Sequence, residues 1–242
     1  MTKVFLFGKN SDSIRHFIPQ FNLELVEDTP EVIISYGGDG TLLSAERKYP
    51  GIPKLPIRDS KTCKKCPAHT TEALLKALAE GLLNFKYFPK LEAKTELADI
   101  LAINDIVIRN ITPMHALRFR VFLNGQQIKP DVIIGDGVVI TTPFGSSGYY
   151  QSITRETVNS GFALAFNNTT KHLESIKFTS PQDIKIVIIR GPGSLSSDNN
   201  PKIYSLKEND EVKITASPHK AQIFMDTLRC ENCVISRDRR LR

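Results

Sequence analysis

The spacing of apolar residues changes near residue 92, and this change restricts the chain to a fold with two different parts. Upstream, short apolar runs such as 31–36 alternate with segments whose apolar residues have helical spacing, as over 71–83. Downstream, short runs that alternate between apolar and polar residues are separated by turns, as over 116–128. The sequence therefore predicts an α/β domain over residues 1–92 and an all-β domain, a β-sandwich, over residues 93–226.

Two local predictions concern the segment that begins at Ser11 and the stretch 191–201. Ser11 is expected to cap a helix that carries Ile14 and Ile18 on one face. The polar stretch 191–201 is rich in glycine and proline, and we expect it to be a loop.

Composition and charge exclude several classes of protein. The 242 residues are 40% hydrophobic and 24% charged, which is ordinary globular composition and rules out a wholly disordered chain. No stretch is long and apolar enough for a transmembrane helix, and the first apolar run is too short for a signal peptide, so we expect a cytoplasmic protein without a membrane partner. The net charge of +6 favours anionic partners but is modest for a nucleic-acid-binding protein, and we expect no nucleic acid.

A glycine-rich segment, Gly37-Gly38-Asp39-Gly40-Thr41, follows the predicted strand 31–36 directly. Glycines let backbone N–H groups approach a phosphate closely, and the N-terminus of a following helix would add positive charge. A carboxylate in such a loop repels phosphates unless a cation intervenes or the carboxylate accepts a proton. Asp39 therefore fits a metal ligand or a base that activates a hydroxyl, and the alternative is a tight turn in which it hydrogen-bonds locally.

Two further segments place polar residues beside predicted strands. Asn104-Asp105 precedes the run 106–108, and an amide beside a carboxylate can bind both hydroxyls of a ribose. Asp136 precedes the run 138–140, which leads into Thr142-Pro143-Phe144-Gly145-Ser146-Ser147-Gly148-Tyr149. In this segment small residues let a flat ring lie against the backbone, Tyr149 can stack on it, and Asp136 can accept from an exocyclic amine. The alternatives are a polar pair at a strand start and a glycine loop beside core tyrosines.

These three segments, in this order, resemble the motif set of the NAD kinases over about residues 30–152. The first is shared with diacylglycerol and sphingosine kinases, whereas the third is specific. The resemblance implies an α/β domain, a β-sandwich and a C-terminal segment, residues 227–242, that returns to the first domain. It also implies transfer of a phosphoryl group from ATP, or from polyphosphate in some members, to the 2′-hydroxyl of the adenosine ribose of NAD, with Mg²⁺ as cofactor.

The resemblance also implies roles for individual residues. Asp39 would be the general base for the 2′-hydroxyl, and Asn104 and Asp105 would bind the ribose on the nicotinamide side. The phosphate loop would be lined by Gly38, Gly40 and Thr41. The adenosine would be surrounded by Asp136, Ser147, Gly148, Tyr149 and Ser152. Because members commonly form dimers or tetramers, we expect a homodimer or homotetramer.

The chain departs from the family pattern at four places. Asp105 replaces the usual Glu, and Gly148 replaces the usual Ala. The stretch 151–155 replaces a glycine-rich segment, and Met225-Asp226-Thr227 replaces an Asp-Gly pair. These differences bear on dinucleotide specificity more than on the fold. Two alternatives stay open: a kinase of the same superfamily that acts on another hydroxyl, of a lipid or a nucleotide, and a non-catalytic NAD(P)-binding regulator.

The four cysteines form two C-x₂-C pairs, Cys63 with Cys66 and Cys230 with Cys233. Two such pairs suit a tetrahedral zinc ion bound by four thiolates. Their separation is far longer than in common zinc ribbons, but the pairs can meet if the C-terminal segment returns as the resemblance implies. We expect a structural Zn²⁺ site, which the general family pattern does not include. The alternative is four free thiols.

Overall fold

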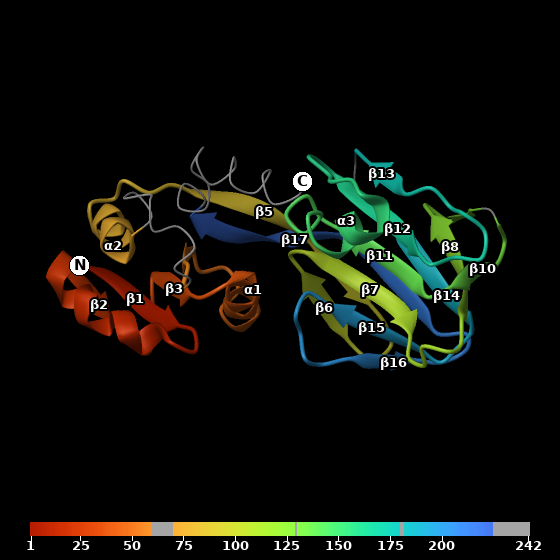
Figure 1. Cartoon of the computed structure of the whole chain (residues 1–242), viewed down its shortest axis with the longest axis horizontal. Coiled ribbons are helices and arrows are strands. Elements are labelled where there is room, and N and C mark those ends of the chain that lie inside the picture. Colours follow the sequence, from red (N-terminus) through yellow and green to blue (C-terminus); the bar gives the residue numbers. More distant parts are fainter. Residues whose placement is uncertain (60–69, 129, 180–181, 225–242) are drawn as a thin grey trace. The chain divides into compact units, whose positions relative to one another are not determined.

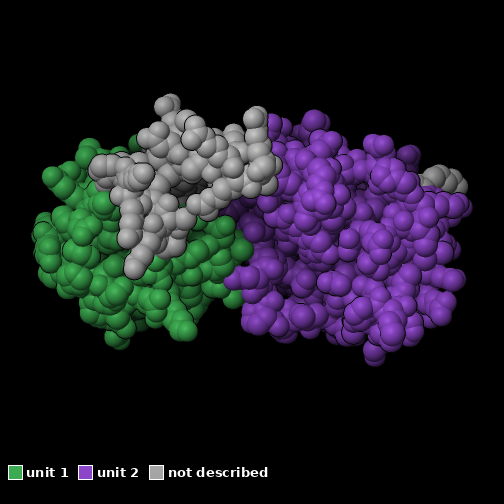
Figure 2. All heavy atoms as spheres, viewed as in Figure 1, with its two compact units in different colours: residues 1–88, 220–242 green, residues 89–219 purple. Residues whose placement is uncertain are grey.

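The computed structural model describes residues 1–59, 70–128, 130–179 and 182–224. The described residues divide into two compact units, 1–88 with 220–224 (unit 1) and 89–219 (unit 2) (Figure 2). The chain passes between the units within β5 (Phe85–Lys94) and within β17 (Glu211–Phe224) (Figure 1). The sequence predicts these divisions a few residues later, at 92 and 226, and the predicted return of 227–242 lies outside the described residues.

Unit 1 is an α/β unit built on a parallel sheet in the order β4-β3-β1-β2. The end of β17 pairs with β4 in parallel, Ile223 opposite Lys54. The other elements of the unit are β1 (Thr2–Phe7), η1 (Ser11–Phe21), β2 (Leu23–Leu25), β3 (Val32–Tyr36), α1 (Asp39–Lys48), β4 (Lys54–Ile57) and α2 (Thr71–Ala79). Four of the five residues of β3 are buried, as expected for a parallel strand covered on both faces. Because the strands are parallel, the segments that follow β1, β3 and β4 leave the same edge of the sheet.

The helices of unit 1 differ from the sequence prediction in detail. The helix expected after Ser11 is a 3₁₀ helix, and its N-cap is Asn10 rather than Ser11. The Ser11 hydroxyl instead donates to the carbonyl of Gly8 (2.9 Å). Ile14 and Ile18 are buried, as their spacing predicts. In the described residues, no helix is long and apolar enough to cross a membrane.

Unit 2 consists of strands in two sheets that share one hydrophobic core. One sheet is antiparallel, in the order β13-β12-β11-β7-β15-β16, and its neighbours β7, β11 and β12 are seen side by side in Figure 1. Its strands are β7 (Asp105–Asn110), β11 (Gly137–Thr141), β12 (Phe162–Asn167), β13 (Ile176–Phe178), β15 (Gly193–Ser197) and β16 (Tyr204–Leu206). The other sheet contains β17, β5, β6 (Asp99–Ala102), β8 (Leu117–Leu123), β9 (Gln126–Gln127), β10 (Ile133–Gly135) and β14 (Ile184–Arg190). The α/β unit and the all-β unit thus confirm the predicted fold class.

The loop predicted over 191–201 is wrong in its middle, because residues 193–197 form β15. This strand pairs antiparallel with β7, Leu195 opposite Ile108 and Ser197 opposite Ile106. Its sequence, Gly-Ser-Leu-Ser-Ser, contains a single large apolar residue, so the pattern carries little strand signal. Pairing with a strand far away in the sequence overrides the weak local preference. The helix α3 (Tyr149–Thr154) was likewise not predicted.

Candidate active site

The glycine-rich segment of unit 1 lies where β3 ends and α1 begins. Gly38 is the N-cap of α1 in an extended conformation, and Asp39 is the first residue of the helix. The N–H of Thr41 donates to the carbonyl of Gly38 (3.0 Å). Apart from its neighbours in the chain, nothing lies within 4 Å of the position that a Cβ on Gly38 would occupy. The backbone at the positive end of this helix is therefore accessible to an anion.

Two other glycines are required by close packing beside this segment. A Cβ on Gly8 would lie 2.2 Å from the carbonyl oxygen of Tyr36, and Gly8 has a φ of +141°. A Cβ on Gly37 would lie 2.3 Å from Oγ1 of Thr41. The first contact packs the segment after β1 on the end of β3, and the second keeps the turn between β3 and α1 tight.

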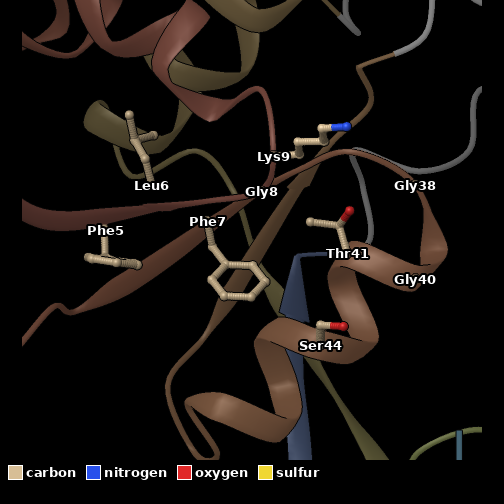
Figure 3. A pocket seen from close by; sticks show the side chains of 9 residues that line it. All are labelled: Phe5, Leu6, Phe7, Gly8, Lys9, Gly38, Gly40, Thr41 and Ser44. Atoms are coloured by element: carbon tan, nitrogen blue, oxygen red, sulfur yellow. The ribbon is translucent and has the colours of Figure 1, made fainter. Parts of the chain in front are cut away.

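An open cleft of about 800 Å³ lies next to these segments. It is lined by Phe5, Leu6, Phe7, Gly8, Lys9, Gly38, Gly40, Thr41 and Ser44. Figure 3 shows that these residues come from two places: the end of β1 with the segment that follows it, and the start of α1 with the segment before it. The ammonium group of Lys9, the hydroxyl of Thr41 and the N-terminus of α1 are groups that suit a phosphate.

The carboxylate of Asp39 is paired with Arg58, which directly follows β4. The Nη2 atom of Arg58 lies 3.4 Å from Oδ1 of Asp39. The side chain of Asp39 is 80% exposed and that of Arg58 is 44% exposed, so the pair is screened by water and weak. Next to it, the amide of Asn10 donates to Asp59 (2.7 Å). The sequence analysis missed Arg58, although its place directly after a strand at the same sheet edge as Asp39 could have indicated it.

In unit 2 the structure brings the Asn104-Asp105 pair together with the first part of the third motif. The carbonyl of Asn104 accepts from the N–H of Thr142 (2.9 Å) and from the hydroxyl of Thr141 (3.1 Å). A Cβ on Gly145 would lie 2.3 Å from Cα of Asn104, so the loop packs directly on the Asn104 backbone. The side-chain oxygen of Asn104 is buried and has no hydrogen-bond partner in the described residues. Such an atom is available to a ligand.

Asp105 is held beside a second, partly buried carboxylate, that of Asp198. The carboxylate of Asp198 accepts from the N–H groups of Ile103 (3.0 Å), Asn104 (2.8 Å) and Asp105 (3.2 Å). Burial and the charge of Asp198 raise the pKa of Asp105 to about 7. Burial also raises the pKa of Asp198, whereas the three hydrogen bonds and the charge of Lys90 lower it. The sequence analysis missed Asp198 because it lies in the stretch expected to be a loop.

Asp136 lies at the other end of the β7–β11 pair, because Asp105 is opposite Thr141 whereas Arg109 is opposite Gly137. The separation is the length of β11, about 14 Å. The two oxygens of Asp136 accept from the amides of Asn110 (3.2 Å) and Asn168 (3.0 Å).

Tyr149 is connected to the Asp136 end of the sheet. Its hydroxyl accepts from the amide of Asn167 (2.9 Å), the residue before the Asn168 that bonds to Asp136. Ser147, Gly148 and Ser152 are exposed, and Gly148 is the N-cap of α3. Tyr150 is fully buried, so only the first of the two tyrosines is accessible to a ligand.

Comparisons with known proteins identify NAD kinases as relatives of this chain. No protein-family model matches the sequence. The chain is 28% identical over 245 residues to the NAD kinase of Sulfurisphaera tokodaii, which covers 92% of this chain and 94% of that one. The chain is thus similar to an NAD kinase over nearly the whole length of both proteins. The NAD kinase of Natranaerobius thermophilus is 23% identical over 241 residues, 91% of this chain and 81% of that one.

Solved structures of an NAD kinase and an NADH kinase have the same fold as this chain. The crystal structure of an NAD kinase from Archaeoglobus fulgidus in complex with ATP has a TM-score of 0.74 at 20% identity and covers 93% of both chains. The structure of yeast NADH kinase complexed with NADH has a TM-score of 0.79 at 15% identity, over 96% of this chain and 84% of that one. Both likenesses support the two-domain fold expected from the motifs.

The predicted zinc ligands Cys63, Cys66, Cys230 and Cys233 all lie outside the described residues. Within the described ranges, no group of three or more His, Cys, Asp or Glu side chains could hold a metal ion. The zinc site therefore stays a prediction of the sequence.

Proposed function

We propose that this protein is an NAD kinase that phosphorylates the 2′-hydroxyl of the adenosine ribose of NAD, with ATP or polyphosphate as the donor. The observation that carries the proposal is an alignment with an NAD kinase over 92% of the chain. The accessible Asp39 in a phosphate-binding loop supports it, because phosphoryl transfer to a hydroxyl needs a proton acceptor beside the phosphates.

In the proposed reaction, one carboxylate of unit 1 accepts a proton and several positive groups of the same unit neutralise negative charge. Asp39 accepts the proton of the 2′-hydroxyl while the oxygen of that hydroxyl forms a bond to the terminal phosphorus of the donor. The bond between that phosphorus and the leaving phosphate oxygen breaks, and the leaving group keeps the electron pair. Lys9, Arg58 and the N-terminus of α1 are the groups that can neutralise the transferred charge.

Mg²⁺ is the metal that this chemistry implies, and the residues of the loop suit it. Mg²⁺ is usually bound by one or two carboxylates together with substrate phosphates and water, rather than by a cage of protein ligands. Asp39 provides such a carboxylate, and the described residues contain no cluster of three or more His, Cys, Asp or Glu side chains that could bind a metal ion by itself. When bound, the ion would neutralise the phosphates of the donor.

Unit 2 supplies the groups proposed to bind the dinucleotide. The buried, unpartnered oxygen of Asn104 can accept from a ribose hydroxyl, and Asp105 lies next to it. At the far end of β11, Asp136 and Tyr149 remain the proposed adenosine-binding residues, together with Ser147, Gly148 and Ser152. A lipid kinase has no need of the Asn104-Asp105 pair, and a non-catalytic regulator has no need of Asp39, so neither alternative is favoured.

The test is an assay of NADP formation by the purified protein with Mg²⁺. Four reactions compare NAD with NADH as the acceptor and ATP with polyphosphate as the donor. We expect 2′-phosphorylated product in at least one of them. If no combination yields a 2′-phosphorylated dinucleotide, the proposed function is wrong.

Three finer properties are proposed from the sequence and the family resemblance. We propose a homodimer or homotetramer, which light scattering of the purified protein tests. A structural Zn²⁺ bound by the four cysteines predicts one zinc per chain, and four freely titrating thiols without zinc would contradict it. The cytoplasmic location stays a prediction that fractionation of cells tests.

A further inference from the structure

We propose that Asp198 is a positioning residue of the dinucleotide site, which holds the Asn104-Asp105 turn in place. This inference rests on the proposed function, because it assigns the turn to binding a ribose. Asp198 belongs to neither the three motifs nor their immediate neighbours in the sequence.

The first argument is the geometry of the backbone around Asp198. Its carboxylate accepts from three consecutive N–H groups, those of residues 103–105, at 2.8–3.2 Å. Its own N–H donates to the carbonyl of Asp105 (3.0 Å). Consecutive N–H groups around an anion form a concave binding site, and hydrogen bonds to a charged acceptor are strong. Four hydrogen bonds thus fix one turn to the end of β15, a strand more than 90 residues away.

The second argument is that this turn carries side chains prepared for a ligand. The side-chain oxygen of Asn104 is buried without a partner in the described residues. Asp105, the next residue, is buried too, with 8% of its surface exposed. The Asn104 oxygen lacks the hydrogen bond that a buried polar atom normally makes, and the Asp105 carboxyl group can accept a further one. A ribose diol brings two O–H donors and would satisfy both.

The third argument is the distribution of charge. The charged groups that face the turn are Asp198 at the end of β15 and the buried Lys90 on β5, which favours the ionised form of Asp198. From β11 and the loop after it come Thr141, Thr142 and uncharged neighbours. Asp198, with three donors and a nearby cation, is therefore the better stabilised anion. Asp105 has no such support, and the repulsion from Asp198 favours its protonated form.

A ribose that donates hydrogen bonds to Asp105 stabilises the ionised form of this carboxyl group. Binding of the dinucleotide should therefore release a proton. It should become tighter as the pH rises through about 7, the pKa of Asp105 in the protein without a ligand. At pH 7 about half of the molecules carry the proton, so we expect release of about half a proton per NAD bound.

The experiment measures equilibrium binding of NAD by calorimetry between pH 6 and pH 8, without a phosphoryl donor and in buffers of different ionisation enthalpy. The variant is Asp198→Asn, which keeps the shape but removes the charge. We expect NAD affinity to fall by about tenfold or more at pH 8 and the midpoint of its pH dependence to move below that of the wild type. The matched control is Asp210→Asn, a partly exposed aspartate of the same unit that also accepts a backbone N–H, from Lys207 (2.7 Å).

The outcomes separate the inference from the proposed function. A folded Asp198→Asn variant with wild-type affinity and an unshifted pH midpoint would overturn the inference, and a loss of affinity without a shift would reduce Asp198 to a structural role. If that variant does not fold, Asp105→Asn decides, because its NAD affinity should no longer change between pH 6 and pH 8. An unchanged pH dependence in Asp105→Asn would contradict the inference. Failure of the wild type to bind NAD at any pH would instead contradict the proposed function.

Discussion

Replacing Arg58 by alanine should reduce catalysis strongly while changing stability little. Arg58 contacts Asp39 at 3.4 Å, but the two side chains are 44% and 80% exposed. An exposed ion pair contributes about 0–1 kcal/mol to folding, so Arg58→Ala should lower the free energy of unfolding by less than about 1 kcal/mol. Because the ion pair is weak, the guanidinium of Arg58 can leave Asp39 and bind the oxygens of the transferred phosphoryl group instead.

The catalytic cost should be much larger than the cost in stability. Removing one group that stabilises charge in a transition state typically costs about 10²- to 10³-fold in kcat, which corresponds to roughly 3–4 kcal/mol. Arg58→Lys keeps the charge but loses the planar fork that matches a phosphate, so its kcat should lie between those of Arg58→Ala and the wild type. The KM for NAD should not change, because Arg58 belongs to the segment proposed to bind phosphate rather than ribose.

The assay is steady-state NADP formation with urea unfolding of the same variants. The matched control is Arg15→Ala, which removes another exposed Arg–Asp pair of unit 1, Arg15 with Asp12 at 3.0 Å. The control should keep wild-type kcat. If Arg58→Ala also keeps wild-type kcat, or loses activity only in proportion to lost stability, the assignment of Arg58 to the phosphoryl group is wrong.

Three further predictions concern the framework of the two units. Lys54 and Glu46 form an ion pair with side chains that are 0% and 4% exposed. Because Lys54→Met leaves the Glu46 charge buried alone, it should lower the free energy of unfolding in urea by about 3–5 kcal/mol. The double variant Lys54→Met with Glu46→Leu should recover most of this loss. A double variant less stable than the single one would contradict this. Gly145→Ala places a Cβ 2.3 Å from Cα of Asn104, and it should cost about 1–3 kcal/mol and raise the KM for NAD; an unchanged KM would refute the close packing as a requirement of the site. The folded-state pKa of Asp105, about 7, exceeds its ordinary value of 3.8, so folding takes up a proton between these pH values and stability falls as pH rises through them. Each unit of pKa shift corresponds to about 1.4 kcal/mol in the free energy of unfolding. Asp105→Asn should remove this contribution, so its free energy of unfolding should differ less between pH 5 and pH 8 than that of the wild type.

Much of the fold can be predicted from apolar periodicity alone. The change from helical spacing to alternation predicts both units, and the buried run ending at Gly37 predicts β3 and the start of α1. The strand β15 cannot be found in this way, because a Gly-Ser-Leu-Ser-Ser sequence pairs with β7 only once the rest of the sheet exists. The 3₁₀ geometry of η1 is equally invisible to a pattern that records only which residues are apolar.

The site can be predicted only in part for a similar reason. Asp39, Asn104 and Asp105 stand in motifs whose residue types suggest their chemistry directly. Arg58 and Asp198 belong to no motif. The only sequence signal for Arg58 is its place directly after a strand, and Asp198 becomes recognisable only when β15 brings it beside the Asn104-Asp105 pair. The same holds for Gly145, whose need for close packing on Asn104 depends on a contact between segments about forty residues apart.

The most direct test of the central claim compares NADP formation by the wild type and by Asp39→Asn. Because the Asp39 side chain is 80% exposed, the variant should fold as the wild type does, which thermal unfolding verifies. The account predicts NADP from the wild type with Mg²⁺ and ATP or polyphosphate, and a rate at least about 10²- to 10⁴-fold lower for the variant. Wild-type protein that makes no NADP with either donor, or an Asp39→Asn variant as active as the wild type, would contradict it.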